Sequence, residues 1–167
     1  MKQSLLNVGA MALLLVSLIV LPSSARAAGL EVGKKAPAWI LKAPDGKDVK
    51  STEFKGKVIV LNFWATWCGP CVKEIPDFIE IQNELGEKGV TFVGVSLDAS
   101  PSPVKKYVKR TAVNYPVVMG DSDVVKDYGN FNAIPHTFVI DKEGVIRLSK
   151  SGMIKKGDLL ASIKPLL

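Results

Sequence analysis

The sequence predicts an α/β domain with helices on both faces of one sheet. Apolar, β-branched runs typical of buried strands alternate with helical patterns between residues 58 and 128. Two final strand-like runs joined by Lys142-Glu143-Gly144 predict an antiparallel edge on that sheet. The chain has 167 residues, which is long enough for one domain with a sizeable core.

The first 27 residues have the pattern of an export signal. Lys2 precedes an uncharged apolar run over residues 8–21, and Ala25-Arg26-Ala27 has the small-x-small pattern of a cleavage site. We expect cleavage after Ala27, although an uncleaved membrane anchor is the alternative. In either form the protein is expected in the periplasm or at the extracytoplasmic face of the membrane. Residues 28–36 are expected to link the signal to a domain over residues 37–167.

The expected elements follow one another in a regular order. Residues 38–42 and 48–50 flank the turn pattern Pro44-Asp45-Gly46-Lys47 and predict a β-hairpin, followed by one helical turn over 51–54. The remaining expected elements are a central strand 58–63, a helix to about residue 87 with a kink at Pro76, a buried strand 90–97, a helix 104–112, a strand 115–119, a helix 122–128, strands 137–141 and 145–149, and a helix 154–166.

The only two cysteines, Cys68 and Cys71, lie where the central strand ends and the long helix begins. Their spacing allows a disulfide, and the unpaired N–H groups and dipole of the helix start favour a thiolate. A purely structural disulfide is the alternative, but closing so short a loop removes little chain entropy. The spacing therefore favours redox chemistry, with Cys68 as the exposed attacking thiolate and Cys71 as the deeper resolving thiol.

The charge distribution gives little support to nucleic-acid binding. The net charge is +6, and without residues 1–27 it is +4, because Lys2 and Arg26 are lost and 20 basic residues remain against 16 acidic ones. The excess is modest and spread over predicted helix faces, as expected for solvated surfaces. We therefore expect no nucleic-acid partner.

The segment Leu-Asn-Phe-Trp-Ala-Thr-Trp-Cys-Gly-Pro-Cys at residues 61–71 resembles the active site of thioredoxin. It is most similar to that of exported thioredoxin-like proteins of the TlpA/ResA/CcmG type, and the resemblance covers most of residues 30–167. It implies a thioredoxin fold with a central mixed sheet flanked by helices, an N-terminal β-hairpin and a central αβ insertion. It also implies a reduction potential near about −270 mV rather than about −120 mV.

The same resemblance implies a thiol–disulfide oxidoreductase that reduces disulfides of exported proteins. Its implied substrates are apocytochrome c or copper-site proteins, and a membrane dithiol would supply the electrons. No cofactor beyond the Cys68–Cys71 disulfide is expected, and a monomer is the default. The residues expected to bind substrate are Trp67, Gly69, Pro70, Ile134 and His136.

Two further residues are expected to act with the dithiol. Ile134-Pro135 matches the cis-proline loop of this family, in which the backbone before the proline pairs with an extended substrate segment; an ordinary trans proline is the alternative. Glu74 lies on the helix face of Cys71 and, by resemblance, replaces the buried aspartate of thioredoxin, whose strand position holds Asn62. Burial would raise its pKa and let it shuttle the Cys71 proton. An exposed first-turn glutamate is the alternative.

His136 departs from the family, which usually has threonine after this proline. If it faces the dithiol, it would tune Cys68 or join Cys68 and Cys71 in binding copper. A thioredoxin-fold copper chaperone is therefore the second hypothesis, although such chaperones space their cysteines more widely. A partly exposed strand histidine is the plainer interpretation. A peroxiredoxin is disfavoured, because Ala65 stands where its motif requires threonine.

Overall fold

The computed structural model describes residue 30 and residues 32–167. The predicted export signal, residues 1–27, lies outside the described residues. In the described part, the strands are β1 Ile40–Lys42, β2 Asp48–Lys50, β3 Val58–Trp64, β4 Val90–Ser96, β5 Val117–Met119, β6 His136–Ile140 and β7 Ile146–Ser151. The helices are α1 Gly69–Leu85, α2 Pro101–Thr111, α3 Ser122–Asp127 and α4 Lys156–Ile163, with 3-10 turns at Ser51–Phe54, Gly86–Lys88 and Lys164–Leu166.

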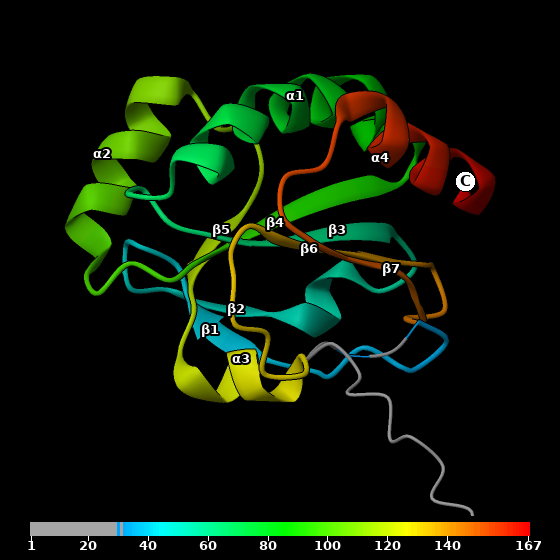
Figure 1. The fold of residues 1–167 in the computed structure, drawn as a ribbon, viewed down its shortest axis with the longest axis horizontal. Helices are drawn as coiled ribbons and strands as arrows, with labels where there is room; N and C mark the ends of the chain where they lie inside the picture. The colour runs from blue at the N-terminus through cyan, green and yellow to red at the C-terminus, as the bar shows by residue number, and fades with distance from the viewer. Residues whose placement is uncertain (1–29, 31) are drawn as a thin grey trace, which may run out of the picture.

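These strands form one mixed sheet in the order β2-β1-β5-β4-β3-β6-β7. The central strands β3, β4 and β5 are parallel, β6 pairs antiparallel with β3, and β7 pairs antiparallel with β6 at the edge of the sheet. Helices α1 and α4 pack side by side over one face, and α3 lies on the other (Figure 1). The predicted α/β class, with helices on both faces and an antiparallel edge, is confirmed.

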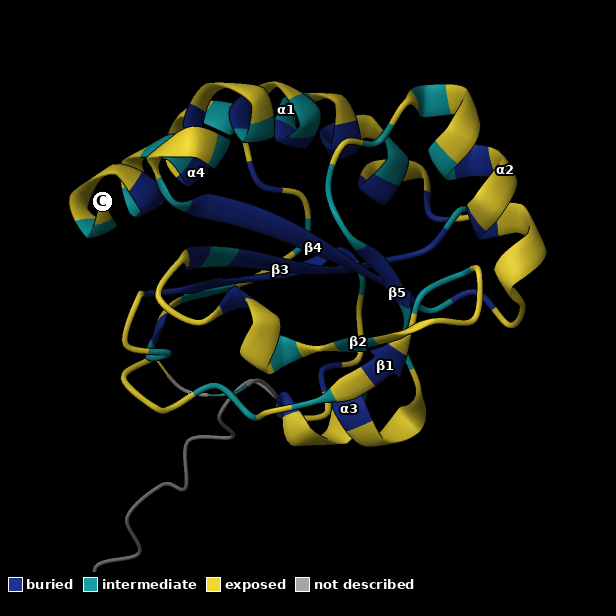
Figure 2. Cartoon of the chain, turned by 180° about the vertical axis from the view of Figure 1, so that it is seen from behind, coloured by how far each residue is buried: buried dark blue, intermediate teal, exposed yellow. Residues whose placement is uncertain are grey.

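Strands β3 and β4 are buried almost throughout because helices or loops cover both faces of the sheet (Figure 2). This explains why they read as continuous apolar runs rather than alternating ones. On the α3 side, the core contains a cluster of rings from Phe63, Tyr128, Phe131 and Phe138. None of the helices within residues 32–167 is long and apolar enough to cross a bilayer.

Several element boundaries differ from the expected ones. Helix α2 begins at Pro101 rather than at residue 104, since proline fits the first turn of a helix, where its missing N–H is not needed. Strand β5 begins at Val117 rather than at residue 115. The last expected helix is divided into α4 and a 3-10 turn. Helix α1 continues past Pro76, as expected, and ends at Leu85 rather than at about residue 87, where a 3-10 turn follows it.

Candidate active site

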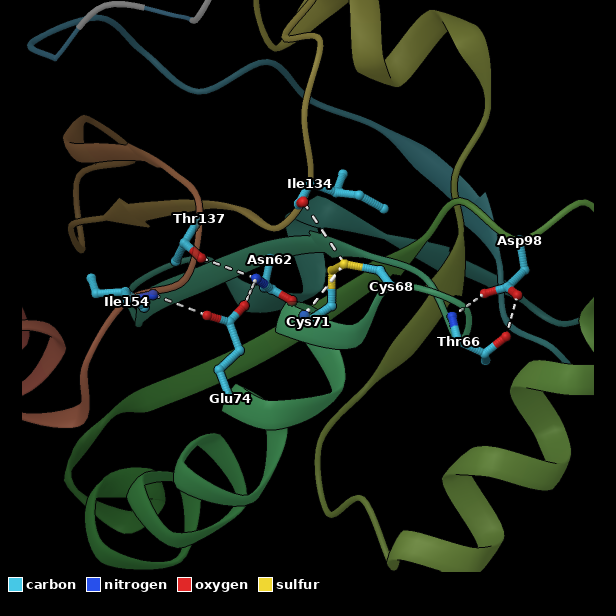
Figure 3. The surroundings of a disulfide bond; sticks show 9 residues. All are labelled: Asn62, Thr66, Cys68, Cys71, Glu74, Asp98, Ile134, Thr137 and Ile154. Carbon is cyan, nitrogen blue, oxygen red and sulfur yellow. Dashed lines mark hydrogen bonds between the residues drawn. A yellow bond between two sulfur atoms is a disulfide. The ribbon is translucent and has the colours of Figure 1, made fainter.

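The two cysteines form a disulfide at the start of α1 (Figure 3), with their Cα atoms 5.3 Å apart. Strand β3 ends in a turn that is closed where the N–H of Cys68 donates to the carbonyl of Ala65, at 3.1 Å. Cys68 then serves as the N-cap residue of α1, and its Sγ accepts from the N–H of Cys71 at 3.3 Å. Since this N–H is one that the helix leaves without an intrahelical partner, it is available to stabilise a Cys68 thiolate.

The two sulfurs differ in access to solvent. Cys71 is completely buried, whereas Cys68 retains 6% of its surface. The expectation of an exposed Cys68 therefore needs correction, because the residue packs in an apolar cluster with Trp64, Ile75 and Val104. Cys68 is nevertheless the only one of the two that reaches the surface. Trp67 beside it is 69% exposed, and Gly69 and Pro70 are also exposed.

The loop before β6 closes over the disulfide from the other side. The Ile134–Pro135 peptide bond is cis, in agreement with the expectation. The carbonyl oxygen of Ile134 lies 3.8 Å from Cys68 Sγ (Figure 3). The carbonyl of Pro135 accepts from the N–H of Gly152 at 2.8 Å, which ties this loop to the segment between β7 and α4. The backbone of Ile134 is thus held next to the attacking sulfur.

Glu74 is buried one turn below Cys71, with 1% of its surface exposed. Its Oε1 accepts from Asn62 Nδ2 at 3.0 Å, and its Oε2 accepts from the N–H of Ile154 at 3.1 Å. Asn62 Nδ2 also donates to Thr137 Oγ1 at 3.0 Å (Figure 3). Burial raises the pKa of Glu74 from 4.5 to about 7, against the opposing effect of the two hydrogen bonds. The exposed alternative is therefore wrong, and Glu74 titrates near neutral pH.

His136 does not face the dithiol. Successive strand residues point to opposite faces, so Thr137 faces Glu74 while His136 enters the aromatic cluster on the other face. Its ring lies between Phe131 and Phe138, with centroid distances of 4.6 and 4.7 Å, and 3% of the residue is exposed. Both the substrate-binding role and the partly exposed interpretation are corrected, because the Phe131 loop covers the ring.

The environment of His136 also keeps it neutral. Its Nε2 lies 3.0 Å from Ser149 Oγ, and its Nδ1 is buried without a partner. Burial lowers its pKa to about 4. Within residues 32–167, no three His, Cys, Asp or Glu side chains are arranged to hold a metal ion. The structure therefore does not assemble Cys68, Cys71 and His136 as a copper site.

One buried carboxylate near the dithiol was missed by the sequence analysis. Asp98 lies two residues after the end of β4 and accepts hydrogen bonds from Thr66 in the turn that ends at Cys68. A signal for it was present in the sequence. A carboxylate directly after a buried strand that lies parallel to the central strand falls at the same edge of the sheet as Cys68.

A central strand thus delivers a dithiol to a helix start, opposite a proline loop and above a buried carboxyl group. This arrangement defines a thioredoxin-fold thiol–disulfide oxidoreductase. Residues 31–162 match the model of the Redoxin family, and the chain belongs to that family.

The similar proteins agree with this class. The thiol–disulfide oxidoreductase ResA of Bacillus thuringiensis subsp. konkukian (strain 97-27) is 37% identical over 118 residues, which cover 70% of this chain and 68% of the relative. ResA of Bacillus subtilis (strain 168) is 34% identical over 136 residues, covering 80% and 76%. The crystal structure of a putative thiol:disulfide interchange protein DsbE from Chlorobium tepidum is 30% identical, with a TM-score of 0.76 over 82% of this chain and 98% of that one. The predicted family and the oxidoreductase class are confirmed.

Proposed function

We propose that this protein reduces disulfide bonds of proteins outside the cytoplasm, using the dithiol form of Cys68 and Cys71. The observation that carries the proposal is the fully buried Cys71 above Glu74, whose pKa of about 7 suits proton transfer at neutral pH. A buried thiol cannot meet a protein substrate itself. It can resolve a mixed disulfide on Cys68, provided that a neighbouring base takes its proton.

The reaction follows from the positions of these groups. The Cys68 thiolate, stabilised by the N–H of Cys71, attacks one sulfur of the substrate disulfide, and the other substrate sulfur leaves as a thiolate. Cys71 then transfers its proton to the Glu74 carboxylate and attacks Cys68 Sγ. The Cys68–Cys71 disulfide forms and the second substrate sulfur leaves. Two electrons pass to the substrate, and a dithiol donor must reduce the protein again.

Substrate binding is assigned to the surface around Cys68. The Ile134 backbone beside Cys68 Sγ can pair with an extended substrate segment, as in strand addition. Trp67, which precedes Cys68 in the turn, provides a large exposed apolar surface. Gly69 and Pro70 present no bulky side chain between them. A substrate segment can therefore lie across Cys68 without displacing the core.

The cellular setting is part of the proposal. The apolar run at residues 8–21 supports export, and a structural neighbour from Corynebacterium glutamicum is described as a secreted thiol-disulfide isomerase. We propose exported substrates, either apocytochrome c or a copper-site protein, with electrons from a membrane dithiol donor. The exchange needs no cofactor besides the Cys68–Cys71 disulfide, and the protein is proposed to act as a monomer.

The direction of the reaction can be tested by measuring the reduction potential. The purified protein is equilibrated with mixtures of reduced and oxidised dithiothreitol, and the dithiol fraction is read by alkylation and mass spectrometry. We expect a potential well below about −200 mV, while a value near about −120 mV would identify an oxidant instead. Cys68→Ser is the control that lacks the couple. The rates of reduction of a Cys-x-x-Cys-His disulfide peptide and a copper-site disulfide peptide then compare the two substrate classes.

A further inference from the structure

Asp98 makes an unusual set of contacts for a residue of a surface loop. It lies two residues after the end of β4, and only 8% of it is exposed. Its Oδ2 accepts from the backbone N–H of Thr66 at 2.9 Å and from Ser96 Oγ at 2.8 Å. Its Oδ1 accepts from Thr66 Oγ1 at 2.5 Å (Figure 3). Both donors of Thr66 are therefore directed at one carboxylate.

Thr66 belongs to the turn that carries the reactive residues. Ala65 and Cys68 close this turn through a backbone hydrogen bond, so Thr66 and Trp67 are its two central residues. Trp67 is the exposed ring beside the dithiol, and Cys68 follows it. The ends of this turn, Ala65 and Cys68, are buried in the core, whereas its centre is less covered, because Thr66 is half-buried and Trp67 projects into solvent. The carboxylate of Asp98 is thus a main attachment of the turn to the neighbouring strand.

We infer that Asp98 is a positioning residue for the dithiol, because it holds both donors of Thr66 and so fixes the turn that presents Trp67 and Cys68 to a substrate. The inference rests on the proposed function, in which a substrate meets Cys68 and Trp67 together. Parallel pairing of β3 with β4 places Trp64 opposite Ser96, so the two loops must leave the sheet at the same edge. Hydrogen bonds to a charged group are also stronger than neutral ones.

If Asp98 acts by positioning the turn, losing its contacts should make the Cys68 thiolate less stable, whereas if it acts through its charge, losing that charge should make the thiolate more stable. A negative carboxylate near a thiolate disfavours the thiolate, so removing its charge alone would favour it. Positioning acts the other way. If the turn drifts, the N–H of Cys71 no longer points at Cys68 Sγ, and the thiolate loses a donor. Variants that remove the hydrogen bond of the Thr66 hydroxyl but retain the charge of Asp98 separate the two effects.

The test uses Thr66→Val, which removes the hydroxyl and retains its shape, and Thr66→Ser, which restores the hydroxyl. Thr111→Val is the matched control, because Thr111 Oγ1 donates to the Tyr107 carbonyl at 2.8 Å on α2, outside the turn. Two quantities are measured on the full protein: the pH midpoint of Cys68 alkylation by iodoacetamide, and KM and kcat for reduction of a cystine-bridged peptide.

For Thr66→Val we expect a higher alkylation midpoint and a kcat/KM lower by about tenfold, the equivalent of one lost hydrogen bond to a charged group, mainly through KM. Thr66→Ser and Thr111→Val should behave like the unmodified protein. The inference is overturned if Thr66→Val lowers only the stability and leaves both quantities unchanged. It is also overturned if Asp98→Ala lowers the alkylation midpoint while Thr66→Val leaves it in place, since that pattern is a charge effect.

The alkylation measurement separates this inference from the proposed function. If the unmodified protein reduces no peptide disulfide, the proposed reductase function fails. The pH midpoint of Cys68 alkylation does not depend on turnover, so it still reports whether Asp98 and Thr66 position the sulfur.

Discussion

Replacing Glu74 with glutamine should stabilise the protein increasingly as the pH rises from 4.5 to 8. In the folded protein the pKa of Glu74 is about 7, against 4.5 for an unburied glutamate. Between these values the unfolded chain releases a proton that the folded protein retains, so folding becomes less favourable with rising pH. At 1.36 kcal/mol per pH unit, the total loss is about 3 kcal/mol. Glutamine carries no such proton and does not incur this loss.

The substitution preserves most of the local hydrogen bonding. One oxygen of glutamine can still accept from the N–H of Ile154, and rotation of the Asn62 amide can offer its oxygen to the new NH₂ group. His136 contributes an opposite pH dependence, because its folded pKa of about 4 lies below the ordinary histidine pKa of 6.5, so the protein loses stability as the pH falls through this range. The difference between variant and unmodified protein removes this second contribution.

The assay is urea unfolding of the oxidised protein at half-unit steps from pH 4 to 8. The free energy of unfolding of Glu74→Gln, minus that of the unmodified protein, should rise by about 3 kcal/mol over this range. Glu84→Gln, at an exposed position on the same helix, should give a flat difference. A flat difference for Glu74→Gln as well would refute the assignment of a buried carboxyl group that titrates near pH 7.

Three further predictions concern the other site residues. Cys71→Ser should accumulate a mixed disulfide between Cys68 and a substrate, visible on a non-reducing gel, and Cys68→Ser should give none because Cys71 is completely buried; adducts of the second variant would contradict the assigned roles. Trp67→Ala should change the free energy of unfolding by no more than about 0.5 kcal/mol, since the ring is 69% exposed. It should raise KM severalfold for reduction of a protein disulfide, but leave unaltered the rate at which dithiothreitol reduces the Cys68–Cys71 disulfide. If the rate with the protein disulfide and the rate with dithiothreitol fall equally, Trp67 does not bind substrate. His136→Phe should abolish the loss of about 3 kcal/mol in the free energy of unfolding, measured with urea, between pH 6.5 and 4. If the variant loses as much stability in acid as the unmodified protein, another group causes the loss.

The sequence was informative where local pattern decides structure. The buried runs of β3 and β4 and the helical period of α1 are local, so these elements and the dithiol between them could be predicted. Helical spacing also placed Glu74 on the face of Cys71. It could not show that Glu74 is covered, because the backbone N–H above it belongs to Ile154, 80 residues later in the chain.

Contacts between distant segments account for the parts that the sequence did not predict. Asp98 appeared as a loop residue, since no local pattern shows a bond to Thr66, 32 residues earlier. The sequence predicted a strand over residues 137–141, directly after His136, but not the face of the sheet on which this side chain lies. That face is fixed by the register with β3, which pairs Phe63 with His136, and by Phe131 from the preceding loop.

The disulfide and the entry of the chain into the domain lie at opposite ends of the sheet. The N–H groups of Gly33 and Ala36 donate to the carbonyls of Ile146 and Gly144, beside the turn between β6 and β7. Strand β3 separates that turn from Cys68 by about 20 Å, at 3.3 Å per residue. Whatever precedes residue 30 therefore joins the domain far from the reactive sulfur. A tether attached there would leave the disulfide at the other end of the sheet from the point of attachment. The same catalytic surface would therefore serve an anchored protein and a released one alike.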